Sequence, residues 1–148
     1  MAEGLIHVEL TQQQNYQFQI KFGGAAPDLL GDEPPPLGAG LGPSPVQLLA
    51  AAVGNCLSDS LLFALRKFKQ APEPIRCEVS AEVGRNAEGR VRVLKIDAKL
   101  TLGVAATQLL QLDRVLNSFE AYCTVTQSVG AGIPVQVQVW DAQGLRLK

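Results

Sequence analysis

The sequence predicts an α+β fold in which antiparallel sheets pack around one long central helix. Two observations indicate it. Residues 44–69 have the pattern of a single long helix that is apolar on almost every side. Alternating apolar and polar residues before and after this helix form two pairs of neighbouring strands. We therefore expect hairpins rather than crossover units, in a single domain over residues 1–148.

The central helix has clear signals at both ends. Ser44 is a good N-cap, Pro45 suits the first helical position, and Gln47 completes a Ser-x-x-Gln capping box. Pro72 and Pro74 prevent the helix from continuing. Five polar side chains interrupt its apolar sequence, which argues against a membrane span. Because a chain of this size buries such a helix only in part, we expect a second subunit to pack on it.

Alternation predicts a first hairpin from residues 5–11 and 16–22, with residues 12–15 between its strands. Residues 23–43 are rich in Gly and Pro, so we expect a long loop without regular structure. A second hairpin follows over residues 75–83 and 91–102, and a phase slip at Val93 and Leu94 predicts a β-bulge.

The remaining elements lie near the end of the sequence. Thr107 is the expected N-cap of a helix whose leucines recur at helical spacing. A second short helix follows Cys123. Residues 133–140 alternate as a last strand, and residues 145–148 form a short return strand after a turn.

Composition narrows the function. The net charge of −1 gives no electrostatic reason for binding nucleic acid or an anionic membrane. The beginning of the chain lacks the pattern of a signal peptide, so we expect a cytoplasmic protein with reduced cysteines. The cysteines lack metal-site spacing and His7 is the sole histidine, so we predict neither a metal site nor a cofactor.

The three cysteines have different settings. Cys123 directly precedes the helix start at Thr124, where free N–H groups would lower the pKa of its thiol. Cys56 lies about three turns inside the central helix, beyond the reach of the helix dipole. Cys77 falls on the apolar phase of a strand and is expected in the core. The alternative for each is a buried structural thiol, because free cysteine often behaves as a small hydrophobe.

Two motifs resemble those of the OsmC/Ohr-like family. Residues 44–56, ending in Gly54-Asn55-Cys56, are similar to its central-helix motif, and residues 122–128 are similar to its second cysteine motif. The resemblance implies an intertwined homodimer and thiol-dependent reduction of organic hydroperoxides. Cys56 would attack the peroxide as a thiolate, and Cys123 would resolve the sulfenic acid as a disulfide. A dithiol reductant, either a lipoyl protein or a small thiol, would restore the pair.

The resemblance also implies the lining of the substrate site. Gln47, Leu49 and Val53 would lie there, and apolar neighbours such as Leu57 and Phe63 would favour an alkyl hydroperoxide.

The sequence departs from the family pattern at three points. Active members carry Glu where this chain has Gln47, and an Arg ahead of the helix where residues 23–43 hold no basic residue. Thr124 stands where many members have Pro. The alternative function is therefore a non-catalytic or small-molecule-binding protein of the same fold.

Overall fold

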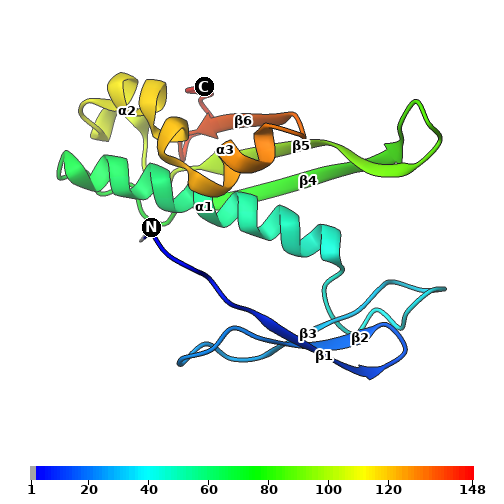
Figure 1. The fold of residues 1–148 in the computed structure, drawn as a ribbon. Helices are drawn as coiled ribbons and strands as arrows, with labels where there is room; N and C mark the ends of the chain where they lie inside the picture. The colour runs from blue at the N-terminus through cyan, green and yellow to red at the C-terminus, as the bar shows by residue number, and fades with distance from the viewer. Residues whose placement is uncertain (1–2) are drawn as a thin grey trace. The chain divides into compact units, whose positions relative to one another are not determined.

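A computed structural model describes residues 3–148, which form two compact units (Figure 1). One unit ends at Leu49 and the other covers Ala50–Lys148, so the boundary falls within the long helix. Each unit is described by itself. The prediction of a single domain stays a prediction.

The first unit contains a three-stranded antiparallel sheet in the order β1-β2-β3. Strands β1 (Glu9–Gln14) and β2 (Gln17–Lys21) form the predicted hairpin, but the turn is shorter than expected. Asn15 makes it by adopting a positive φ of 49°, which Asn tolerates better than most residues. The first strand therefore begins later than residue 5 and includes most of the expected turn.

Strand β3 (Leu29–Gly31) corrects the prediction for residues 23–43. We expected no regular structure there, yet Leu30 pairs with Gln19 and Gly31 pairs with Phe18. The Gly and Pro content of the segment concealed the short strand at residues 29–31. This strand completes the sheet on the open side of β2.

The segment after β3 folds around Asp32, which is almost completely buried. Its carboxylate accepts backbone N–H bonds from Glu33 at 2.8 Å, Ala39 at 3.2 Å and Leu41 at 3.1 Å. These three donors lower the pKa of Asp32, and the Leu41 N–H has the largest effect. At Gly42 the chain passes so close to the Leu30 carbonyl that a Cβ would clash with it. The Pro-rich loop is thus organised by one carboxylate.

Helix α1 (Pro45–Lys67) confirms the predicted central helix and its capping box. The Ser44 N–H donates to Gln47 Oε1 at 2.9 Å, and the Gln47 N–H donates to Ser44 Oγ at 3.2 Å. By length and composition alone α1 could cross a membrane, a property that core helices of soluble proteins share.

The second unit contains a sheet in the order β4-β5-β6, formed by Arg76–Arg85, Val91–Thr101 and Val135–Trp140. The predicted bulge is confirmed, because Glu82 pairs with Lys95 and Val83 with Val93, which leaves Leu94 unpaired. The expectation of antiparallel neighbours holds for β4 and β5 but is wrong for β5 and β6, which are parallel. The chain between β5 and β6 is long enough for this crossover.

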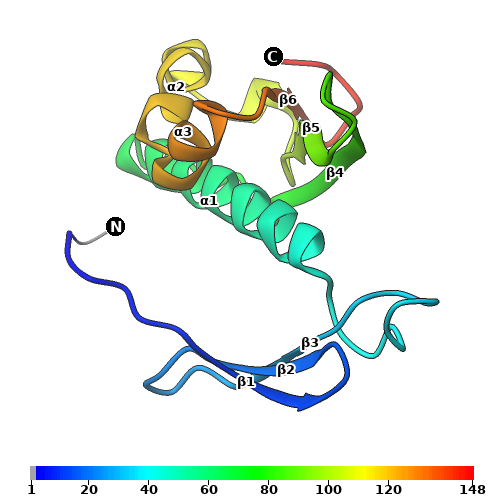
Figure 2. The same ribbon diagram turned by 45° about the vertical axis from the view of Figure 1, so that its right-hand side comes forward.

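The crossover contains the short helices η1 (Ala106–Gln108), α2 (Leu112–Ser118), η2 (Phe119–Tyr122) and α3 (Thr124–Gly130). The prediction that Thr107 caps a helix is wrong, because Thr107 lies inside η1 and α2 begins after Gln111. The expected return strand is reduced to one bridge between Trp140 and Arg146. Figures 1 and 2 both show α2 and α3 beside α1.

The core of the second unit lies between α1, the sheet and the crossover helices. One side of α1 supplies buried side chains, as do the inward-facing residues of β5 and β6, the middle of α2 and the start of η2. These residues are Val53, Leu57, Leu61, Leu65, Ile96, Ala98, Leu100, Val115, Leu116, Phe119 and Val139. Of the β5 residues that point the other way, Lys99 is exposed, and Asp97 and Thr101 are half-buried. This packing fixes the middle of α1 against α3.

Candidate active site

The structure brings Cys56 and Cys123 together in the second unit. Cys56 lies in the middle of α1 and is 7% exposed, and Cys123 immediately precedes α3 and is fully buried. The two side chains are near neighbours, because Cys56 raises the pKa of the Cys123 thiol through a side-chain interaction and through its charge. Both thiols are free. Sequence spacing allowed this pairing but did not require it, since the two residues are on different helices.

A short network of backbone bonds places Cys123. Its N–H donates to the Glu120 carbonyl at 3.1 Å, which closes the 3₁₀ turn of η2, and its own carbonyl accepts the Gln127 N–H at 2.9 Å. The Gln127 side-chain amide also donates to the Glu120 carbonyl, at 3.0 Å. Cys123 is the N-cap residue of α3, and the helix begins at Thr124 as expected. These bonds fix the direction in which its thiol points.

Thr126 is the polar partner of the buried thiol. It lies three residues after Cys123, so its side chain is on the same side of α3. The distance from Cys123 Sγ to Thr126 Oγ1 is 2.9 Å, and Thr126 is only 6% exposed. A hydroxyl can both accept a hydrogen bond from a thiol and donate one to a thiolate. Thr126 can therefore interact with Cys123 in either protonation state.

The environment raises the pKa of Cys123, whereas the sequence had led us to expect a lowered one. Burial is the largest cause, and the neighbouring Cys56 raises the pKa further through a hydrogen bond and through its charge. The hydroxyl and the nearby N–H of Thr126 oppose this, although that N–H makes no capping hydrogen bond with the thiol. Desolvation outweighs these donors, so Cys123 is held in its protonated form.

Cys77 lies on another side of α1. A Cβ built on Gly54 would be 3.4 Å from Cys77 Sγ, and Gly54 and Cys56 point in nearly opposite directions on the helix. From the sequence we expected Cys77 in the core, but the structure shows it half-buried. Burial raises the pKa of the Cys77 thiol, against the effect of a hydrogen bond from Ser58. It borders a hollow of about 300 Å³ between α1 and β4, lined by Ala51, Gly54, Asn55, Ser58, Asp59, Cys77 and Val79.

The residues expected to line the substrate site have different positions. Val53 and Leu57 are fully buried beside Cys56 on α1. Phe63 is 73% exposed, so within the unit it does not enclose the thiols. Gln47 and Leu49 belong to the first unit and are described only within it, where Gln47 is held by the capping box. Of the apolar residues expected around Cys56, the second unit therefore places Val53 and Leu57 beside it but not Phe63.

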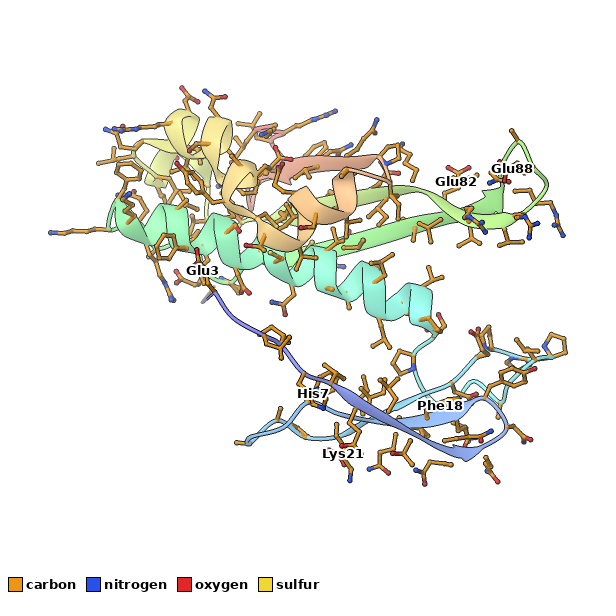
Figure 3. The ribbon with its side chains drawn as sticks, in the orientation of Figure 1. Glu3, His7, Phe18, Lys21, Glu82 and Glu88 are labelled. Carbon is orange, nitrogen blue, oxygen red and sulfur yellow. The ribbon has the colours of Figure 1, made fainter. Side chains whose placement is uncertain are left out.

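Metal-binding groups do not cluster among residues 3–148. His7 comes from the segment before β1, while Glu82 and Glu88 lie at the far end of the β4–β5 hairpin, as Figure 3 shows. None of the groups that shift the pKa of Cys123 is a cation. The polar groups that the structure gathers around Cys123 are the Cys56 thiol and the Thr126 hydroxyl.

Sequence reasoning missed Thr126 and Asp32. The spacing Cys-x-x-Thr at a helix start was the available signal for Thr126, because i and i+3 share a face. Asp32 gave only a weak signal, since an Asp before a Pro-rich segment has no fixed partner in sequence.

The fold is similar to that of several solved structures. An OsmC-like protein of unknown function from Vibrio cholerae matches with a TM-score of 0.77 at 17% identity, covering 93% of this chain and 99% of that one. An organic hydroperoxide resistance protein from Elizabethkingia anophelis matches with a TM-score of 0.73 at 15% identity, covering 95% and 98%. The organic hydroperoxide resistance protein OhrB of Bacillus subtilis matches with a TM-score of 0.70 at 14% identity, covering 92% and 98%.

None of the curated proteins matches the chain significantly. The sequence model of the family described as OsmC-like protein does match, over residues 38–138. This match covers the long helix, both thiols and most of the second sheet. The α+β architecture and the two cysteine motifs agree with it, and the chain belongs to the OsmC-like protein family.

Proposed function

We propose that this protein reduces organic hydroperoxides, with Cys56 as the attacking thiolate and Cys123 as the resolving thiol. The observation that carries the proposal is the nearness of the two buried thiols, since Cys56 raises the pKa of Cys123 and so favours its protonated form. Membership of the family supports a peroxiredoxin-like role, and solved structures of this fold include organic hydroperoxide resistance proteins.

The reaction proceeds in three balanced steps. The Cys56 thiolate attacks the terminal oxygen of ROOH, the O–O bond breaks, and the alkoxide takes a proton to leave as ROH. Cys123 then attacks the Cys56 sulfur, and hydroxide leaves with the Cys123 proton as water. A dithiol finally reduces the Cys56–Cys123 disulfide by exchange and is itself oxidised to a disulfide. The physiological reductant is a lipoyl protein or a small thiol.

The surroundings favour an apolar substrate. Val53 and Leu57 contribute only hydrocarbon next to Cys56, and desolvation favours an alkyl group over the hydrogen-bonding demands of H₂O₂. We place the protein in the cytoplasm, where the disulfide is transient. We further propose a homodimer, because the outward stripe of α1 that includes Ala52, Asn55 and Phe63 is exposed. Sedimentation should give twice the chain mass at micromolar concentration, and a monomer would contradict this.

The test is turnover of cumene hydroperoxide with dihydrolipoamide as reductant. Cys56→Ser should lower the turnover rate at least 100-fold, because no other thiol replaces the nucleophile. Cys123→Ser should stop after one turnover, with a sulfenic acid at Cys56 that dimedone traps. Cys77→Ser is the matched control and should keep full activity, since Cys77 lies on another side of α1. Full activity in Cys56→Ser would exclude the mechanism.

A second candidate function is binding of a small apolar molecule without turnover. Two observations favour it: none of the groups that shift the pKa of Cys123 is a cation, and Gln47 is occupied in the helix cap. Under this function no hydroperoxide would be turned over by the wild type with any dithiol. Saturable turnover that depends on Cys56 would exclude it.

A further inference from the structure

The hydroxyl of Thr126 lies against the sulfur that the proposed function assigns to resolution. The distance from Cys123 Sγ to Thr126 Oγ1 is 2.9 Å, and both residues are buried. Within residues 3–148 every buried side-chain nitrogen or oxygen has at least one partner, and for the Thr126 hydroxyl that partner is the Cys123 thiol. Its side-chain oxygen is therefore committed to the thiol.

We propose that Thr126 is a catalytic residue of the resolution step. Its hydroxyl accepts a hydrogen bond from the Cys123 thiol and donates one to the thiolate that forms when Cys123 ionises. This inference rests on the proposed roles of the two thiols. In the resting state the Cys123 S–H donates to Thr126 Oγ1, as the geometry shows. When the thiol ionises, rotation about the Thr126 C–O bond lets the O–H donate to the thiolate.

The site needs such a donor because burial disfavours the charged thiolate. Desolvation and the neighbouring Cys56 both raise the pKa of Cys123, and the Thr126 hydroxyl lowers it. A hydrogen bond to a charged group is worth more than one to a neutral group. Thr126 therefore stabilises the attacking form more than the resting form, which is the condition for accelerating a step.

Atoms balance without Thr126 being consumed. Cys123 loses its S–H proton, its sulfur forms a bond with Cys56 Sγ, and the S–O bond of the sulfenic acid breaks. The departing hydroxide takes the proton and leaves as water. Thr126 ends the step with the same hydroxyl with which it began.

The experiment uses thiol–disulfide exchange and needs no hydroperoxide. In a Cys77→Ser background, 5,5′-dithiobis(2-nitrobenzoate) reacts with Cys56 and releases one thionitrobenzoate. Attack by Cys123 on the resulting mixed disulfide releases a second, and both phases are followed by absorbance. Thr126→Val removes the hydroxyl at nearly constant volume and should slow only the second phase, by about tenfold at neutral pH.

Thr126→Ser keeps a hydroxyl and should restore the second phase to within a factor of about two. Thr124→Val is the matched control, because it makes the same change at an exposed position of the same helix and should leave both phases unchanged. Thr126→Ala removes the hydroxyl without adding a methyl group, and should repeat the slow second phase if the Val variant folds poorly. An unchanged second phase in Val and Ala variants, or equal slowing in the Ser variant, would overturn the inference.

A second measurement needs no access of a reagent to the buried thiol. The ¹³Cβ chemical shift of labelled Cys123, followed against pH, reports its ionisation directly. Thr126→Val should move the midpoint to higher pH and Thr126→Ser should not. If both results hold but no hydroperoxide is turned over, the proposed function fails and the role of Thr126 in disulfide formation stands.

Discussion

Gly54 and Val79 are in such close contact that only a residue without a Cβ fits on α1 at this point. A Cβ built on Gly54 would lie 2.6 Å from Val79 Cγ2, a distance that real side chains do not show. Val79 belongs to β4 and is β-branched, so it has little rotamer freedom with which to move away. This contact sets the distance between α1 and the sheet, two residues before Cys56.

We predict that Gly54→Ala destabilises the protein by about 1–3 kcal/mol, because overpacking outweighs the better helix propensity of Ala. In a Val79→Ala background the same substitution should become neutral or stabilising, since the clash is gone. Chemical denaturation of the four proteins of this cycle measures the coupling. Gly130→Ala is the control, because no atom lies within 4 Å of its Cβ position, and should not destabilise. Equal effects of Gly54→Ala in both backgrounds would contradict the prediction.

The α1 helix and most of the strands could be predicted because their signals are local. The capping box of Ser44 and Gln47, the alternation along β4 and β5, and the bulge at Leu94 are all determined within a few residues. The parallel pairing of β5 and β6 could not be predicted in this way, because it depends on how the crossover helices return the chain. Thr107 failed as a cap because Gln111, not Thr107, makes the turn before α2.

The candidate site could be predicted only as a set of residues. The motifs singled out Cys56 and Cys123, but the nearness of the two thiols depends on packing between helices that are far apart in sequence. The expected low pKa of Cys123 was wrong because a helix-terminus argument ignores burial, and here desolvation dominates. Burial is a property of the whole fold, which no local pattern contains.

The buried thiols predict a loss of stability in alkali. The folded-state pKa of Cys123, and that of Cys77, lie above the unfolded values, chiefly through burial. Such a group contributes stability that is complete below the unfolded pKa of about 8.5 and is lost as pH rises through the folded pKa. The free energy of unfolding should therefore fall as pH rises above about 8.5.

Denaturation at a series of pH values measures this slope. Cys123→Ser and Cys77→Ser should each make the fall with pH less steep, whatever they do to stability at pH 7, because one titrating group has been removed. Cys56→Ser makes the same substitution beside Cys123, so its fall in unfolding free energy with pH is the comparison for Cys123→Ser. An unchanged slope in both variants would show that other groups cause the loss.

We predict that the Asp32 carboxylate keeps the Pro-rich loop ordered. In Asp32→Asn, one of the acceptor oxygens becomes an NH₂ group that faces backbone donors, so the N–H groups of Ala39 and Leu41 lose a charged acceptor. Their hydrogen exchange should accelerate, and residues 33–43 should become more susceptible to proteolysis. Asp28→Asn is the matched control, because Asp28 accepts a hydrogen bond from the Gln19 side chain and from none of these backbone groups. The same protection in Asp32→Asn as in the wild type would exclude this role.

The lowered pKa of Asp32 also gives the direction of its pH dependence. Its contribution to stability is present above the unfolded pKa of about 3.9 and is lost as pH falls through the lower folded value. Exchange of the Leu41 amide should therefore accelerate more strongly in acid in the wild type than in Asp32→Asn, after correction for intrinsic exchange rates.

The contacts of Lys148 stabilise the turn before Cys123. Its ammonium pairs with the Glu120 carboxylate, donates to the Leu116 carbonyl at 2.7 Å, and lies 5.3 Å from the centre of the Phe119 ring. These contacts place a positive charge at the end of α2, where helix carbonyls are unpaired. Because the Glu120 carbonyl also accepts the Cys123 N–H, the ion pair supports the turn that positions the thiol.

Lys148→Ala should lower the free energy of unfolding by about 0.5–1 kcal/mol, since the partners are about one-third exposed. It should also accelerate hydrogen exchange at the Cys123 amide. Lys148→Arg keeps the charge and should retain most of the protection. Lys95→Ala removes the ion pair with Asp97 on the sheet and is the matched control, with no effect at Cys123. In a cycle with Glu120→Gln, the two effects should be less than additive because the residues share one interaction. Additive effects would mean that Lys148 and Glu120 act independently, and that the turn before Cys123 is held by its backbone bonds alone.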